Sequence, residues 1–251
     1  MINRFHAVAT AACVVFSGSA IATAASYTLA PSQDTFVYAN PGQVFPGGPT
    51  FNNTNFNAGP FSIYLGTAKS NSAHDVASLI QFDLSQLIAD GVSSGEVASA
   101  TLNLYSITNG FGAGTPNASF PVDVSVYKAA ASWNAATATW NSGTPAADGP
   151  ALDTTTVNSI NTFVQFDLLS AMDEWLDAPV TNFGLRLDQD ARVHNGSNEV
   201  GATFRSSAFS DVTLRPFLTI TTVPEPSAIM LAAMGVVGIA GLRRRSRRSA
   251  S

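Results

Sequence analysis

Residues 122–127 read Val-Asp-Val-Ser-Val-Tyr, so apolar and polar side chains alternate along six positions. Successive side chains of a β-strand point to opposite faces, and this alternation predicts a strand with one buried face and one solvated face. Residues 183–188, Phe-Gly-Leu-Arg-Leu-Asp, repeat the pattern with Phe183, Leu185 and Leu187 on the apolar side.

Segments of similar character recur between turn residues over the whole middle of the chain. They are rich in β-branched and aromatic residues, as is typical of strands. Many short strands with one apolar face each, and little helix, predict an all-β fold of two packed antiparallel sheets. We expect one large domain over residues 26–222. The predicted strands are 35–38, 62–66, 78–82, 100–107, 122–129, 137–140, 163–166, 183–187, 202–204 and 217–221.

Two short helices are predicted after a phrase that occurs twice. Gln-Phe-Asp-Leu ends a predicted strand at residues 81–84 and again at residues 165–168. We favour a structural role for Asp83 and Asp167, in which each side chain accepts backbone N–H bonds from the following turn and caps the helix. The second phrase opens an apolar stripe at helical spacing, with Asp173 and Asp177 on a wetter side; its members are Leu168, Met172, Trp175 and Leu176.

The N-terminus, residues 1–25, has the layout of a secretory signal peptide. Arg4 precedes an apolar stretch over residues 7–16, and residues 22–24 read Ala-Thr-Ala, which suits a signal peptidase. A buried helix of the mature fold is the alternative interpretation. Cys13, the only cysteine, lies inside this segment, so the mature domain is expected to form no disulfide.

At the C-terminus, residues 223–251, a Pro-Glu-Pro motif precedes an apolar run and an arginine cluster. As a helix, residues 228–242 would reach about 22 Å, which spans a bilayer core of about 30 Å only marginally. The arginines would stay cytoplasmic and place the preceding domain outside the cytoplasm. The residues that form the signal are Pro224, Glu225, Pro226, Arg243, Arg244 and Arg245.

This order of features resembles the PEP-CTERM sorting signal. The resemblance implies a transmembrane helix before processing and recognition by an exosortase, in Gram-negative bacteria that make exopolysaccharide. An ordinary tail anchor is the alternative. Removing both predicted signals takes away six of the 12 basic residues and one of the 17 acidic residues, so the net charge of −5 becomes −10. Nucleic acid is therefore not an expected partner.

An ordered set of short phrases resembles the DNRLRE domain, which is related to carbohydrate-binding module family 96. The phrases include residues 77–84, 98–105, 124–127, 139–141, 166–168, 182–185 and 215–218. The resemblance implies a β-sandwich of jelly-roll type, and some relatives bind acidic polysaccharides such as alginate. Residues 55–59, Asn-Phe-Asn-Ala-Gly, depart from the usual Asn-Tyr-Gly of the family.

Exposed aromatic rings stack on sugar rings, and arginine complements the carboxylate of an acidic sugar. The candidate carbohydrate-binding residues are Trp133, Trp140, Tyr64, Tyr127, Arg186 and Arg205, with Tyr105 and Arg192 as further options. For Trp133 and Trp140 a structural role in the core is the favoured alternative.

Oxygen ligands for calcium are available from Asp34, or from Asp188 and Asp190 with loop carbonyls; solvated loop carboxylates are the alternative interpretation. The predicted mature domain contains two isolated histidines, His74 and His194, and no cysteine, which makes a poor ligand set for zinc. Residues 91–95, Gly-Val-Ser-Ser-Gly, fit a nucleophile-elbow pattern, but we interpret the match as chance because no strand-to-helix context is predicted there.

These features predict an exported, exosortase-sorted protein of the cell envelope, outer surface or extracellular matrix that binds polysaccharide without catalysis. Its expected partners are signal peptidase, an exosortase, the membrane before processing, and a polysaccharide. No cofactor is expected apart from the candidate calcium ion. Two alternatives remain open, a structural or adhesive module without a sugar site and a polysaccharide-degrading enzyme with paired acids.

Overall fold

The computed structural model describes residues 24–43, 49–70, 74–109, 114–196 and 198–223. Residues 1–23 of the predicted signal peptide lie outside these ranges, as do the Pro-Glu-Pro motif, the predicted membrane helix and the arginine cluster. Within the described ranges, no helix has the length and apolar character needed to cross a membrane.

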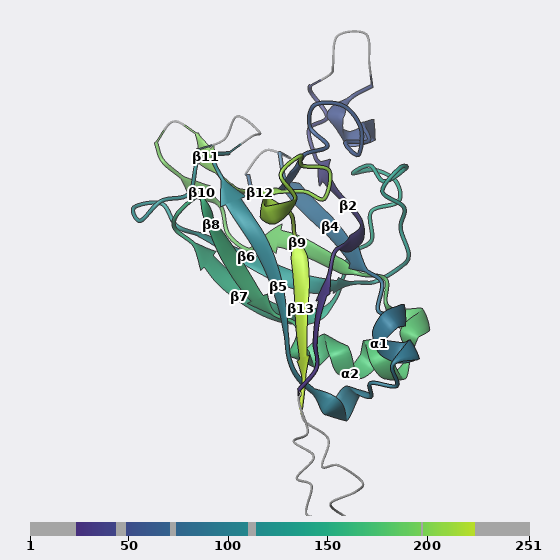
Figure 1. Ribbon diagram of the computed structural model, residues 1–251. Coiled ribbons are helices and arrows are strands. Elements are labelled where there is room, and N and C mark those ends of the chain that lie inside the picture. Colours follow the sequence, from purple (N-terminus) through teal and green to yellow (C-terminus); the bar gives the residue numbers. More distant parts are fainter. Residues whose placement is uncertain (1–23, 44–48, 71–73, 110–113, 197, 224–251) are drawn as a thin grey trace, which may run out of the picture. The chain divides into compact units, whose positions relative to one another are not determined.

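The strands form two antiparallel sheets, as predicted (Figure 1). Sheet I has the order β1-β13-β5-β12-β3, with β8 also paired to β5, and sheet II has the order β2-β4-β9-β6-β7; β10 and β11 form a separate hairpin. The bounds are β1 Ser26–Leu29, β2 Pro31–Tyr38, β3 Tyr64–Thr67, β4 Val76–Phe82, β5 Val97–Ile107, β6 Val122–Ala129, β7 Ala147–Val157, β8 Thr162–Asp167, β9 Leu185–Gln189, β10 Val193–His194, β11 Glu199–Val200, β12 Ala202–Arg205 and β13 Phe217–Thr222. The β-sandwich is confirmed, and the jelly-roll type stays a prediction.

The main core lies between the two sheets because each strand turns its apolar side chains inward. Val122, Val124 and Val126 are completely buried, as their alternation predicted. Across strands, Leu102 of β5 lies opposite Phe166 of β8. The largest completely buried members of the core include Leu65, Ile80, Leu102, Leu104, Phe166 and Phe204. Burial of this apolar surface is the main force that holds the sheets together.

Two α-helices, α1 (Ser85–Ala89) and α2 (Leu169–Asp177), follow β4 and β8, as predicted. Asp83 Oδ1 accepts the backbone N–H of Ser85 at 2.9 Å, and Asp167 Oδ1 accepts that of Leu169 at 2.8 Å, which confirms the predicted role of both aspartates at the helix starts. On α2, Ala171, Met172 and Trp175 face the core. The 3₁₀ turns are η1 (Phe51–Asn53), η2 (Ser94–Glu96), η3 (Pro179–Thr181) and η4 (Val212–Leu214).

Five segments differ from the sequence prediction. The predicted strand 137–140 is wrong, because these residues form a turn with one isolated bridge between Thr139 and Ser142. The sequence does not predict strands β1 and β7 or the short strands β10 and β11. Strand β7 begins with the exposed residues Ala-Asp-Gly-Pro and lies at the edge of sheet II, so it buries too few side chains to produce an apolar alternation.

Candidate functional site

The outer face of sheet II carries a row of polar and aromatic side chains across β9 and β6. Because Leu185 and Leu187 face the core, the residues between and after them face outward. Strand pairing sets Tyr127 opposite Arg186 and Ser125 opposite Asp188. The pairing therefore brings together side chains that the sequence separates by about sixty residues, and we call this set the sheet II row.

Arg186 is held firmly within the sheet II row. Its Nε and Nη2 donate to the two carboxylate oxygens of Asp188 at 2.6 and 2.9 Å, and Nη1 donates to the carbonyl of Pro145 at 2.9 Å. The guanidinium also lies 6.0 Å from the centroid of the Trp140 ring. A bidentate pair of this kind is strong and directional. Arg186 thus serves mainly to fix Asp188 and the loop that carries Trp140.

Asp190 closes the row at the end of β9. Its Oδ2 accepts a hydrogen bond from Ser125 Oγ at 2.6 Å, and its Oδ1 accepts one from the Tyr127 hydroxyl at 3.2 Å. Burial raises the pKa of the Tyr127 hydroxyl, and the neighbouring charge of Asp190 adds to the rise. The Tyr127 ring is therefore half-buried, and its neutral hydroxyl is oriented by the hydrogen bond to Asp190.

The two candidate tryptophans lie in the loop between β6 and β7, which covers part of the outer face of sheet II. Trp133 is 9% exposed and packs in a cluster with Val37 and Leu79. Its Nε1 donates to the carbonyl of Phe183 at 2.7 Å. Trp140 is half-buried at the margin of this cluster. The alternative of a structural role in the core therefore fits Trp133, whereas the side chain of Trp140 is partly exposed to solvent.

A second candidate group lies on the outer face of sheet I. Tyr64 of β3 pairs with Arg205 of β12, next to Leu65 and Phe204, which face the core. The Arg205 guanidinium lies 3.7 Å from the centroid of the Phe209 ring and 6.0 Å from that of Tyr64. Its Nε is buried and has no hydrogen-bond partner among the described residues. Cation–π contact holds this charge in a fixed plane.

The three predicted calcium ligands lie in two separate places. Asp34 is buried inside the sandwich, where its two oxygens accept bonds from the N–H and hydroxyl of Ser207 at 2.7 and 2.8 Å. Asp188 and Asp190 face outward and accept the bonds described above. Among the described residues there is no cluster of three or more acidic, histidine or cysteine side chains that suits a metal ion.

Burial raises the pKa of Asp34 above its usual value, although the Ser207 bonds and Arg215 act in the opposite direction. The pKa of Asp34 is thus higher in the native state than in the unfolded state. At a pH between these two values the native state binds more protons than the unfolded state, so the stability that Asp34 contributes is lost as the pH rises. We predict that the free energy of unfolding of Asp34→Asn, relative to wild type, increases between about pH 3.5 and pH 7. Urea unfolding of both proteins at the two pH values measures this, and a constant difference would contradict it.

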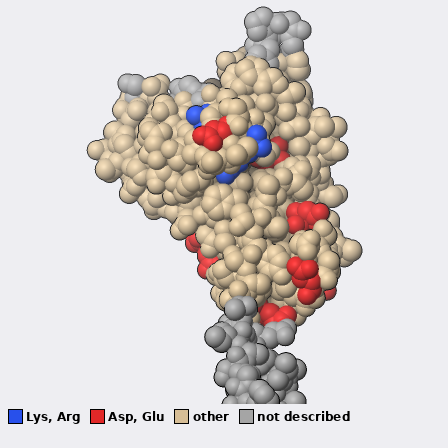
Figure 2. Space-filling model, in the orientation of Figure 1, with Lys and Arg blue, Asp and Glu red and all other residues tan. Residues whose placement is uncertain are grey.

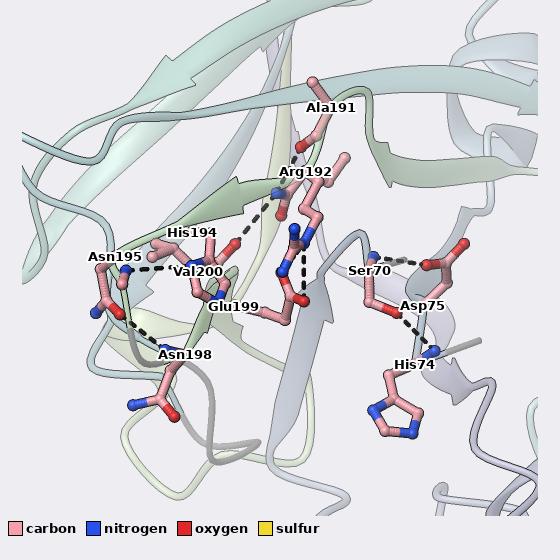
Figure 3. A network of polar contacts seen from close by, with 12 residues as sticks. Ser70, His74, Asp75, Ala191, Arg192, His194, Asn195, Asn198, Glu199 and Val200 are labelled. Atoms are coloured by element: carbon pink, nitrogen blue, oxygen red, sulfur yellow. Dashed lines mark hydrogen bonds and ion pairs between the residues drawn. The ribbon is translucent and has the colours of Figure 1, made fainter. Parts of the chain in front are cut away.

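Most basic side chains of the described chain are already paired with acids. Arg192 Nε donates to both carboxylate oxygens of Glu199 at 2.8 and 2.7 Å in the β10–β11 hairpin (Figure 3). The other ion pairs among the described residues are Lys69–Asp75, Lys128–Asp148, Lys128–Glu174 and Arg186–Asp188. On the face in Figure 2, Lys and Arg form one small group, whereas only acidic residues mark the end with α1 and α2.

The nucleophile-elbow match has a structural explanation. Ser93 Oγ donates to Glu96 Oε2 at 2.7 Å, and the Ser93 backbone N–H donates to the same oxygen, in a capping box at η2. Both described histidines lie elsewhere, near the network in Figure 3, and the ring of His194 accepts the N–H of Gly196. The serine thus caps a turn, as the chance interpretation implied.

The structure therefore gathers Trp140, Tyr127 and Arg186 in one place and Tyr64 with Arg205 in another. Sequence reasoning missed Phe209, which stacks on Arg205 from the loop after β12. Phe209 follows Arg205 by four positions, but outside a helix that spacing carries no signal. The pairing of Arg186 with Asp188 had a usable signal, because residues two apart share a face of a strand.

The fold is thus that of a two-sheet β-sandwich module, with aromatic and arginine side chains on its outer faces. The chain belongs to carbohydrate-binding module family 96, whose family model matches residues 25–221. This family consists of non-catalytic modules. The PEP-CTERM protein-sorting motif matches residues 222–245 and indicates export to the cell envelope or surface. No individual curated protein matches the chain.

Proposed function

We propose that an exosortase sorts this protein to the outer surface or extracellular matrix of a Gram-negative bacterium, where the module binds a polysaccharide that bears carboxylates. The sorting motif after the module supports the route. The family supports carbohydrate as the ligand. The class of polysaccharide is inferred from the side chains of the two candidate groups.

The observation that carries this proposal is that the Arg205 guanidinium stacks on Phe209 and forms no ion pair with a described residue. Four of the six described basic residues form ion pairs, and a fifth, Arg215, donates its Nε to the carbonyl of Phe209 at 2.6 Å. Arg205 instead stacks on Phe209 and forms no ion pair with a described residue. A planar guanidinium that is fixed but not neutralised suits bidentate binding of a carboxylate.

The mature domain is acidic overall, so an acidic polymer needs a local basic contact to overcome repulsion. Arg205 supplies that contact, and the ring of Tyr64 beside it supplies an apolar surface for a sugar ring. On sheet II, Trp140 and Tyr127 offer further stacking surfaces, with Arg186 fixing the loop. Each sugar contact adds affinity along the polymer, since linked weak contacts reinforce one another.

Residues Ala24–Val223 form one compact unit that contains both sheets. Retention of this domain in native gels that contain alginate or native exopolysaccharide tests the proposal. We expect retarded migration at polymer concentrations that retard a known binding module. A calcium chelator should leave the retention unchanged, because all three predicted calcium ligands already accept hydrogen bonds from protein groups. Unretarded migration in every polymer would instead favour a structural or adhesive module, and release of reducing ends would favour an enzyme.

Fractionation of cells with and without exosortase tests the proposed route. The protein should reach the outer surface or matrix only when exosortase is present. Identical fractions in both strains would favour the ordinary tail anchor.

A further inference from the structure

The repeated Gln-Phe-Asp-Leu phrase ends one strand in each sheet. Phe82 of β4 and Phe166 of β8 are both buried in the core between the sheets. The glutamine and the aspartate on either side of each phenylalanine therefore project from the outer face of sheet II in the first copy and of sheet I in the second. The two copies thus present the same side chains on opposite faces of the sandwich.

Both aspartates are fixed in the same way. Each uses Oδ1 to accept the backbone N–H of the residue two positions later, Ser85 or Leu169, and each carboxylate remains exposed. The bonds from Ser85 lower the pKa of Asp83, so this carboxylate is ionised at neutral pH. A carboxylate that is oriented by the backbone and open to solvent is a pre-organised hydrogen-bond acceptor.

Each copy also lines a pocket. The β4 pocket has a volume of about 400 Å³ and includes Asp83, Ser32, Ser85 and Trp175. The β8 pocket has a volume of about 310 Å³ and includes Asp167, Asp153, Ser99 and Thr101. Both volumes fall in the range of small-ligand sites. Two related sequence copies therefore build two pockets of similar size.

The chemistry of the two pockets is also similar. Each combines one or two carboxylates with two hydroxyl side chains and one apolar side chain that is at least partly exposed, Ile88 in the β4 pocket and Leu169 in the β8 pocket. Their described lining includes no lysine, arginine or histidine. Such a pocket accepts hydrogen bonds from sugar hydroxyls and repels anionic sugars.

We propose that the β4 pocket and the β8 pocket are two related subsites for uncharged sugar units, one on each face of the sandwich. This inference rests on the proposed polysaccharide binding and extends it. The carboxylate contact at Arg205 and the two uncharged subsites together specify a mixed polymer. Because the subsites face opposite ways, one domain holds two polymer segments and links them within a matrix.

Isothermal titration of the Ala24–Val223 domain with uncharged hexasaccharides of glucose, galactose and mannose tests the inference. We expect at least one to bind with two sites per domain. Asp83→Asn and Asp167→Asn each keep an acceptor oxygen for the helix start, and each should weaken one site at least tenfold. The double variant should lose both sites. Asp173→Asn, on the exposed side of α2, removes the same charge and should bind as wild type.

A single site, no binding of any uncharged hexasaccharide, or unchanged binding by both Asn variants would overturn the inference. A parallel titration with an oligo-uronate separates this outcome from failure of the proposed function. If the oligo-uronate binds and the uncharged sugars do not, only the two-subsite inference fails. If neither binds, the proposed function fails with it.

Discussion

Trp133→Ala is expected to lower the free energy of unfolding by about 3–5 kcal/mol, the usual cost of truncating a large aromatic side chain in a core. The indole is 9% exposed and packs with Val37 and Leu79 outside sheet II. It also donates to the carbonyl of Phe183, which would be left without this bond. Because this cluster anchors the loop that carries Trp140, the variant should lose ligand affinity as well. Urea unfolding followed by circular dichroism measures the change.

Two further variants separate packing from hydrogen bonding. Trp133→Phe retains most of the apolar contact and removes the Nε1 donor, so it should cost roughly 1–2 kcal/mol. Trp140→Ala removes a half-buried ring and should cost less than Trp133→Ala. A loss below about 1 kcal/mol for Trp133→Ala would contradict the buried role of this side chain.

Arg205→Ala is expected to weaken binding of an acidic oligosaccharide about 10- to 150-fold, which corresponds to a lost charged hydrogen bond of about 1.5–3 kcal/mol. The stack on Phe209 holds the guanidinium in place before the ligand arrives, so little side-chain entropy is lost on binding. Removal of the side chain eliminates the charge, the planar donor pair and the neighbour of Tyr64 together. Titration calorimetry with an oligo-uronate measures the affinity.

Two matched variants test whether the effect belongs to this site. Arg205→Lys keeps the charge but loses the planar pair of donors, and should recover only part of the affinity. Arg192→Ala removes an arginine that Glu199 already neutralises, and should bind nearly as wild type. Equal affinities of wild type and Arg205→Ala, with folding intact, would refute the assignment of Arg205.

The sandwich was largely predictable because most of its strands bury one face. The spacing of Val122, Val124 and Val126 predicts β6. The aspartate in each Gln-Phe-Asp-Leu phrase predicts a helix start. The sequence does not predict strand β7, because the stability of this strand depends on its pairing with β6 rather than on its own buried side chains. Hydrogen bonds to a neighbouring strand leave no periodic trace in the sequence.

The candidate site was less predictable because contacts between distant segments decide what each residue does. Trp133 and Trp140 lie in the same loop, and only the packing shows that one is buried and the other borders Arg186. Similarly, Arg186, Arg192 and Arg205 look alike in the sequence. Their different partners, Asp188, Glu199 and Phe209, give them different roles.

A glycan array probed with the folded Ala24–Val223 domain tests carbohydrate recognition by the outer faces most directly. We predict signals on polysaccharide glycans that contain uronate units, and loss of those signals in Arg205→Ala. A correctly folded domain that binds no glycan, or one whose signals are the same in Arg205→Ala, would contradict it.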